Sequence, residues 1–376
     1  MVLSVLCASV VTLMNPKELT GTLEIKDAWT RRRAEGRRFA FTLMGLGLTL
    51  ALSIWLASAI GRMDVGWQDI GLAFLNKIGL SSYALDRTAE VVIFQIRLSR
   101  AVLAGLVGAS LAVAGVIFQG LLRNPLADPF TIGVSTGAAF GAALLVVLGV
   151  EGVLWGLSSL PLGALAGALL ALLAVLMLSR EQGRIRQESL VLAGIVVSTF
   201  LSALISLMKS LDEESLSAIV FWIMGSFSGR GWVHVGFLLP YGLAGLILAA
   251  LNARELDILA LGEEQSHYLG VSVSRTRLQL LLAASLLTAA AVSVSGVIGF
   301  VGLVVPHLIR LLAGPSHGRL LLLSALAGAL TLIWADVLSR VILPGGQELP
   351  VGVVTALLGG PFFFYLLKTR KGRGLW

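Results

Sequence analysis

The chain has 376 residues, of which 57% are hydrophobic and 13% are charged, whereas soluble domains carry about 25% charged residues. This composition excludes an ordinary water-soluble enzyme and indicates a membrane protein. The net charge of +7 would suggest a nucleic-acid partner in a soluble protein. Here the charges lie between long uncharged runs, so we expect membrane lipid as the surroundings and no nucleic acid.

The first 38 residues are predicted to form a cytoplasmic N-terminal tail. Residues 2–14 are apolar but lack the basic start of a signal peptide, so a disordered or interfacial segment is expected. A true start further along the chain is the alternative interpretation. Cys7 is the only cysteine and can form no internal disulfide.

Ten membrane-spanning helices are predicted from residue 39 onward. A helix needs about 20 apolar residues to cross the bilayer, because lipid offers no partner for free backbone groups. Eight uncharged runs are predicted to cross: 39–61, 101–122, 129–150, 152–179, 189–208, 231–253, 320–335 and 349–367. The glycine-rich run 278–309 is too long for one helix, so two helices joined near Gly299 are predicted there.

Residues 215–229 are short for a span, and the distribution of basic residues decides their placement. Short cytoplasmic loops carry the excess of Lys and Arg. With ten spans and both termini inside, 20 of the 28 basic residues face the cytoplasm and eight face outward. An eleventh span would reverse every later loop, so a re-entrant or interfacial helix is expected on the outer face. The membrane domain is predicted over 39–368, with a cytoplasmic tail at 369–376.

Small residues recur at the spacing of closely packed helices, as in Gly163 and Gly167, which predicts a dense all-α bundle. The sequence AVAGVI at 112–117 is similar to SVSGVI at 293–298, in a span of opposite direction. An inverted internal repeat, as found in many transporters, would produce such a pair, and a chance match is the alternative.

Residues that could carry catalysis are scarce. The sequence contains no phosphate-binding loop, so the chain is not expected to hydrolyse ATP, and it contains no His or Cys cluster that would hold a metal. Asp336 lies inside a predicted span, with Arg340 four residues later. A structural ion pair between them is favoured over a role in ion coupling.

Two polar segments on the cytoplasmic side are candidates for working parts. Residues 123–129, with the sequence RNPLADP, form a turn stiffened by prolines, and a merely rigid interhelical turn is the alternative. In 252–277, the longest inner loop, residues 256–269 are predicted to be helical and to present polar side chains to the cytoplasm. The acidic start of this helix favours a protein partner over an anionic lipid surface.

Eight segments match one family in order: IRLSR at 96–100, GVIFQGLLRNPLADP at 115–129, GVSTG at 133–137, FWIMGSF at 221–227, ALGEE at 260–264, LGV at 269–271, GFVGLVVPH at 299–307 and ELPVG at 348–352. They resemble the FecCD-type permease subunits of type II ABC importers for iron-siderophores, haem and cobalamin. The resemblance implies a homodimer of ten-helix subunits with inverted repeats. It also implies an ATP-binding ABC subunit dimer on the cytoplasmic side and a periplasmic or lipid-anchored substrate-binding protein on the other.

The resemblance also implies roles for particular residues. Family members dock the binding protein through outer arginines, which match Arg97, Arg100 and Arg340 here, and contact with lipid headgroups is the alternative for each. The loop 255–270 matches the coupling helices that fit the ATPase, with contacts expected from Glu263, Glu264, Gln265, His267, Tyr268, Leu269 and Gly270.

The inner gate of the family matches Asn124, Pro125 and Leu126. A second gate position is Gln187, where the cobalamin member has a small hydroxyl residue. The resemblance therefore leaves the width of the pathway at Gln187 undetermined.

The sequence therefore predicts one half of an inner-membrane pathway that moves a bulky metal chelate inward while a partner ATPase hydrolyses ATP. No catalytic residue, resident metal or cofactor is expected. The pathway is expected to be lined by small and apolar residues without a tight substrate site, because the binding protein supplies specificity. An ion-coupled secondary carrier and a non-transporting membrane scaffold are the alternatives.

Overall fold

The computed structural model describes residues 16–61, 63, 66–77, 79–80, 86–150, 152–154, 156–181 and 184–369. Residues 2–14, for which a disordered or interfacial segment is predicted, lie outside these ranges. The chain divides into a part that ends at Gly47 and a part from Leu48 to Trp376, and each is considered by itself. Helix α2 (Pro16–Ala59) begins within the predicted tail and continues without a break into the first predicted span.

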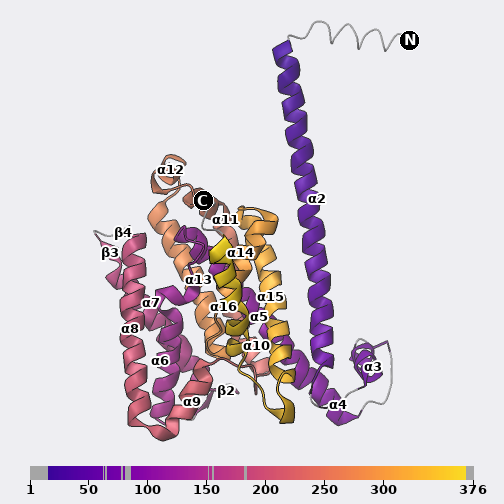
Figure 1. The fold of residues 1–376 in the computed structure, drawn as a ribbon, viewed down its shortest axis with the longest axis vertical. Helices are drawn as coiled ribbons and strands as arrows, with labels where there is room; N and C mark the ends of the chain where they lie inside the picture. The colour runs from indigo at the N-terminus through magenta and orange to yellow at the C-terminus, as the bar shows by residue number, and fades with distance from the viewer. Residues whose placement is uncertain are drawn as a thin grey trace. The chain divides into compact units, whose positions relative to one another are not determined.

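Apolar helices make up most of the second part (Figure 1). Within the described ranges, seven helical stretches are long and apolar enough to cross a membrane: residues 36–59 of α2, the stretch Arg87–Leu121, α7 (Ser159–Leu178), α8 (Gln187–Leu211), α10 (Trp232–Leu251), α13 (Val273–Ser295) and α15 (His317–Val341). Three shorter helices, α6 (Val134–Val147), α14 (Val301–Ala313) and α16 (Val351–Thr369), fall in the remaining predicted spans. A mostly helical protein with several membrane-spanning segments is confirmed, whereas ten crossings and the inverted repeat stay predictions.

The centre of the bundle is formed by α5 (Ser99–Leu121) and α13, most of whose residues are buried. Glycines allow the neighbouring helices to approach closely. A Cβ on Gly108 of α5 would lie 2.2 Å from the carbonyl oxygen of Gly328 on α15, and a Cβ on Gly115 would lie 1.8 Å from that of Gly302 on α14. No side chain fits at Gly108 or Gly115, because the backbones of the neighbouring helices are in direct contact there.

Two irregular segments set the direction of the chain. Helix α13 ends at Ser295, Gly296 has a φ of +73°, and α14 begins at Val301 after Phe300 with a φ of +68°. The predicted join near Gly299 is therefore confirmed. Between α4 (Arg87–Val91) and α5, residues Val92–Leu98 form the π-helix η1, which no feature of the sequence indicated.

The short helix predicted within 215–229 corresponds to α9 (Glu213–Ile223). Asp212 caps it by accepting hydrogen bonds from the backbone N–H groups of Glu214 and Ser215 at 3.1 and 3.3 Å. The loop after α9 meets the end of α13, where Ser226 donates its backbone N–H to the Ser295 carbonyl at 2.8 Å. The position of α9 at a membrane surface stays a prediction.

Two very short ribbons modify the predicted all-α fold. Strand β1 (Val153–Leu154) pairs with β2 (Leu157–Ser158), and β3 (Arg180–Glu181) pairs with β4 (Arg184–Ile185), both antiparallel. The other short elements are α3 (Trp67–Lys77), η2 (Pro129–Ile132), η3 (Pro344–Gly346), α11 (Ala253–Leu259) and α12 (Glu263–Tyr268).

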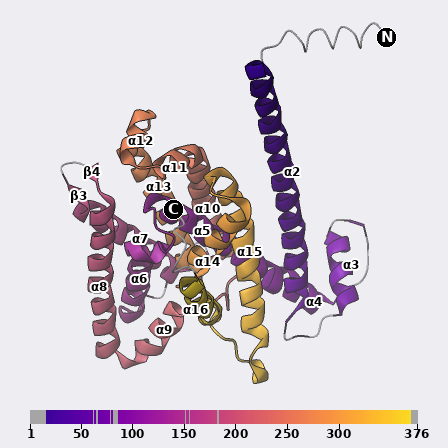
Figure 2. The ribbon, with the colours of Figure 1, turned by 45° about the horizontal axis from the view of Figure 1, so that its top comes forward.

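Figures 1 and 2 show β3, β4, α11 and α12 at one end of the helix bundle, and α9 at the opposite end. The first is called the inner end below, because the predicted cytoplasmic loops lie there, and the second is called the outer end.

Candidate functional site

The segment predicted to couple the chain to an ATPase consists of two short helices at the inner end, α11 and α12. The predicted single helix over 256–269 is wrong, because Gly262 between them has a φ of +121°, a conformation that interrupts a helix. The Ser266 hydroxyl joins the two helices by donating to the Ile258 carbonyl at 3.0 Å. We call this pair of helices the coupling unit.

Large apolar side chains of the coupling unit are exposed. The exposed fractions are 62% for Leu261, 81% for Tyr268 and 59% for Leu269. All residues predicted to contact the ATPase are exposed there: Glu263, Glu264, Gln265, His267, Tyr268, Leu269 and Gly270. Apolar side chains exposed next to polar ones are typical of a surface that binds another protein.

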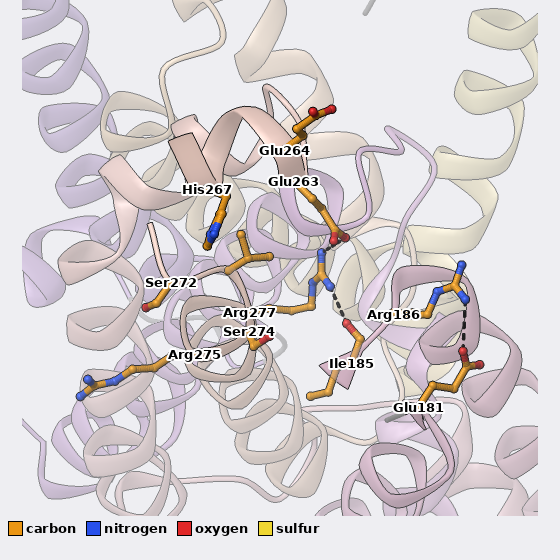
Figure 3. A pocket seen from close by; sticks show the side chains of 11 residues that line it. Glu181, Ile185, Arg186, Glu263, Glu264, His267, Ser272, Ser274, Arg275 and Arg277 are labelled. Carbon is orange, nitrogen blue, oxygen red and sulfur yellow. Dashed lines mark hydrogen bonds and ion pairs between the residues drawn. The ribbon is translucent and has the colours of Figure 1, made fainter. Parts of the chain in front are cut away.

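A charged groove of about 1230 Å³ separates α12 and the start of α13 from β3 and β4 (Figure 3). Arg277, which is 4% exposed, connects its two sides, because Nη2 lies 2.5 Å from Glu263 Oε1 and Nη1 donates to the Ile185 carbonyl. On the other rim, Arg186 pairs with Glu181 at 3.2 Å. Hydrogen bonds from the Ser189 hydroxyl and from Arg186 hold the pKa of Glu181 below its usual value.

A second connection joins the coupling unit to α15. Asp257 Oδ1 accepts the His317 backbone N–H at 2.8 Å and lies 2.6 Å from His317 Nδ1. Burial raises the pKa of Asp257, but the hydrogen bonds from His317 outweigh it and hold the pKa below its usual value. The His317 side chain is buried against α5, since a Cβ on Gly120 would lie 2.7 Å from its Nε2. His317 therefore connects α11 to both α15 and α5.

The predicted gate residues meet at the inner ends of α5 and α8. Asn124 Oδ1 accepts the Leu126 backbone N–H at 2.9 Å, in a turn that also contains Pro125 and that starts at Arg123 with a φ of +44°. Gln187, the first residue of α8, accepts from Arg123 Nη2 at 3.3 Å and donates to a carbonyl at the end of α5. Asn124, Leu126 and Gln187 line one pocket of about 440 Å³.

Asp128 closes the same turn as the N-cap of η2. Its Oδ1 accepts the Phe130 backbone N–H at 3.1 Å. Burial raises the pKa of the Asp128 carboxyl to about 6, although this hydrogen bond lowers it. The turn beside the gate thus contains an acid with a raised pKa of about 6.

The three arginines predicted to dock a binding protein are buried within the chain, with exposed fractions of 4% for Arg97, 6% for Arg100 and 8% for Arg340. Arg100 holds Asp336 with Nε and Nη2 and pairs with Glu348 at 3.0 Å. Arg340 Nε lies 3.3 Å from Asp336 Oδ2, which confirms the predicted structural pair. Arg97 donates to the Ala59 carbonyl at 2.8 Å. Docking would require these bonds to open, so that role stays a prediction.

Three residues that fasten the coupling unit were missed by the sequence reasoning: Asp257, Arg277 and His317. Arg277 is the last residue of the predicted inner loop, directly before the uncharged run that begins at Leu278, and this position was the available signal for it. Asp257 and His317 are 60 residues apart, and neither has a local feature that distinguishes it.

Comparison with known proteins gives one family. Residues 49–369 match the FecCD transport family. The chain is 44% identical over 355 residues to the ABC transporter permease protein YvrB of Bacillus subtilis (strain 168), covering 93% of this chain and 100% of that relative. It is 44% identical to the hemin transport system permease protein HmuU of Yersinia pestis, over 87% of this chain and 96% of the relative. It is 41% identical to the cobalamin import system permease protein BtuC of Halobacterium salinarum, over 82% of this chain and 81% of the relative.

The fold agrees with the family. A solved inward-facing structure of a metal-chelate type ABC transporter matches with a TM-score of 0.76 at 34% identity, covering 87% of this chain and 98% of that one. Residues 49–369, which match the family, include the gate turn, the coupling unit and the outer arginines. The chain thus belongs to the FecCD transport family, and it is a permease subunit of an ABC importer, a transport subunit that relies on a partner for ATP hydrolysis.

Proposed function

We propose that two copies of the chain form the inner-membrane pathway of an importer for a bulky metal chelate, which is an iron-siderophore, haem or cobalamin. Relatives named for hemin, cobalamin and Fe(3+) dicitrate support this substrate class. In this proposal each subunit crosses the membrane ten times, with both termini in the cytoplasm. An ATP-binding ABC subunit dimer docks at the inner end, and a substrate-binding protein docks at the outer end.

The exposed apolar surface of the coupling unit is the observation that carries the proposal. Leu261, Tyr268 and Leu269 are exposed and lie outside the helices that are long and apolar enough to cross a membrane. Exposed apolar area of this kind has a free-energy cost of about 25 cal/mol per Å² in water, so a partner protein is expected to bury it. The unit is also fastened to α13 by Arg277 and to α15 by Asp257, so a push from that partner reaches the bundle.

The gate role is proposed for Asn124, Pro125, Leu126 and Gln187, which lie in or beside one turn at the inner ends of α5 and α8. A turn held by hydrogen bonds between two helices opens when those helices separate, and no covalent step is needed. Arg100 would contribute to docking if a partner carboxylate replaced Asp336 or Glu348 as its acceptor.

Reconstitution tests the proposal. Proteoliposomes that contain the chain with its ATPase and binding protein should accumulate one of haem, ferric citrate or cobalamin only while ATP is hydrolysed. Accumulation by the chain alone would support a secondary carrier instead, and no accumulation of any of these chelates by the complete complex would support a scaffold.

Thiol labelling tests the proposed orientation. Lys77→Cys should react with an impermeant reagent from the outer face, and Tyr268→Cys should react only from the inner face. Reaction of both from the same face would contradict the ten-span topology.

A further inference from the structure

A polar pocket of about 360 Å³ lies at the outer end, away from the coupling unit and the gate. It is formed by α9, the loop that follows α9, the end of α13 and the loop that precedes α16. Three of the sequence segments quoted above, around 221–227, 293–298 and 348–352, therefore meet at one place. Neither the gate nor the coupling unit uses these residues.

Glycines bring the three segments together. A Cβ on Gly296 would lie 2.2 Å from the Trp222 carbonyl oxygen, and one on Gly352 would lie 2.2 Å from the Met224 carbonyl oxygen. Gly225 has a φ of +72°, and a Cβ there would lie 2.5 Å from the Val297 carbonyl oxygen. Backbone segments in direct contact give the pocket a fixed wall.

Two residues that line the pocket contain buried hydrogen-bond donors that lack acceptors among the described residues. Trp222 lines the pocket, its side chain is buried to 8% exposure, and its Nε1 has no partner in the described structure. Arg230 also lines the pocket, and its buried Nε has no partner among the described residues. Leaving such donors unpaired is costly, so native structures rarely do so unless something else supplies the acceptor.

The charged residues that line the pocket are Arg230 and Glu348. Glu348 reaches its edge, but that carboxylate is already paired with Arg100 at 3.0 Å. Arg230 Nη1 lies 3.1 Å from His234 Nε2, a neutral acceptor at best. Burial lowers the pKa of Arg230 from its usual value, and no carboxylate of the described residues offsets this effect. A cation held here without a counter-ion attracts an anionic group.

We infer that this pocket is an outer subsite that binds a carboxylate group of the transported chelate, with Arg230 as the charged donor and Trp222 as the neutral donor. The inference rests on the proposed function for the nature of the ligand, and it departs from the expectation of a pathway without any substrate site. At about 360 Å³ the pocket holds one side group and not a whole chelate, so it orients the substrate as it leaves the binding protein.

Citrate protection of a single thiol tests the subsite without any transport. Ser228, exposed at the pocket, is changed to Cys in a Cys7→Ser background, and the full-length chain is placed in nanodiscs without ATPase or binding protein. Citrate should slow labelling of this thiol more than sodium chloride of equal ionic strength. The Arg230→Gln change should weaken the protection about tenfold, which corresponds to about 1.4 kcal/mol, and Arg230→Lys should restore part of it.

Matched variants separate the subsite from general effects. Trp222→Phe removes one donor and should also weaken protection, whereas Trp232→Phe, whose indole donates to the Phe94 carbonyl instead, should not. A thiol at Thr88, exposed on α4, should show no protection by citrate. Equal protection by chloride, or unchanged protection in both Arg230→Gln and Trp222→Phe, would overturn the inference. If the complete complex transports no chelate but the chain shows this protection, the proposed function is wrong and the subsite is still supported.

Discussion

Asp257→Ala tests whether the contact between α11 and α15 transmits the action of the ATPase. The change removes the acceptor of two hydrogen bonds, from the backbone and the side chain of His317 at 2.8 and 2.6 Å. Hydrogen bonds to a charged group contribute about 1.5–3 kcal/mol each when buried. Because the Asp257 side chain is 40% exposed, water recovers part of this energy, and we take about 2 kcal/mol for both together.

A loss of about 2 kcal/mol changes the ratio of fastened to unfastened coupling units about 30-fold. The proposed docking surface on α12 is unchanged, so ATP hydrolysis and co-purification of the ATPase should be preserved. Chelate uptake per ATP hydrolysed should fall about tenfold or more. The assay is simultaneous measurement of phosphate release and chelate accumulation in proteoliposomes that contain the complete transporter.

Asp212→Ala is the matched control, because Asp212 caps α9 at the outer end with a similar pair of hydrogen bonds. Asp212→Ala should lower the free energy of unfolding by a similar amount, through loss of the α9 cap, without lowering chelate uptake per ATP hydrolysed. Normal uptake per ATP in Asp257→Ala, or the same loss in both variants, would refute the transmission of movement through Asp257 and His317.

Three further changes test other parts of the structure. Gly115→Ala places a Cβ 1.8 Å from the Gly302 carbonyl oxygen and should cost about 1–3 kcal/mol or more by overpacking. Gly236→Ala, with no atom within 4 Å, should not lower stability, and equal unfolding temperatures of these two variants would contradict the close packing. Gly270→Val forces a β-branched residue to a φ of +81° and should lower uptake per ATP, whereas Gly270→Asn should be tolerated; full transport by the valine variant would argue against a coupling role. Burial raises the pKa of Asp128 to about 6, so the folded chain binds this proton more tightly than the unfolded chain, and stability should fall as pH rises from about 4 to 6. Asp128→Asn, which keeps the capping oxygen, should remove that decrease in an unfolding series from pH 4 to 8; an unchanged pH profile would show that the acid is not responsible.

The membrane-spanning helices could be predicted because their signal is local. The run 101–122 corresponds to α5 (Ser99–Leu121), and the glycines near 299 correspond to the break between α13 and α14. Length and the absence of charge are properties of one segment, and lipid imposes them on each span separately. One helix was predicted over 256–269 in the inner loop, whereas α11 ends at Leu259 and Gly262, with a φ of +121°, precedes α12.

The contacts of the site could not be predicted because they join distant positions. Arg100 and Asp336 are 236 residues apart, and only the packing of α5 on α15 shows that the arginine is neutralised inside the chain. From the sequence, Arg100 was expected to dock a binding protein or to contact lipid headgroups. In the bundle the cost of burying its charge is offset by a bidentate carboxylate, an arrangement that depends on tertiary structure alone.

Helix α15 connects the two ends of the bundle. Its first residue, His317, is fastened to the coupling unit, and Asp336, about 29 Å further along at 1.5 Å per residue, holds Arg100 of α5. Between these points Gly108 and Gly328 bring the two helix backbones into contact, so α5 and α15 have no space to slide past each other. In the proposed mechanism, a push on α11 would move both helices as one body, together with Arg100 and Arg340 at the outer end. If the ATPase docks as proposed, this pair of rigid helices would carry its action to the outer end without any flexible relay.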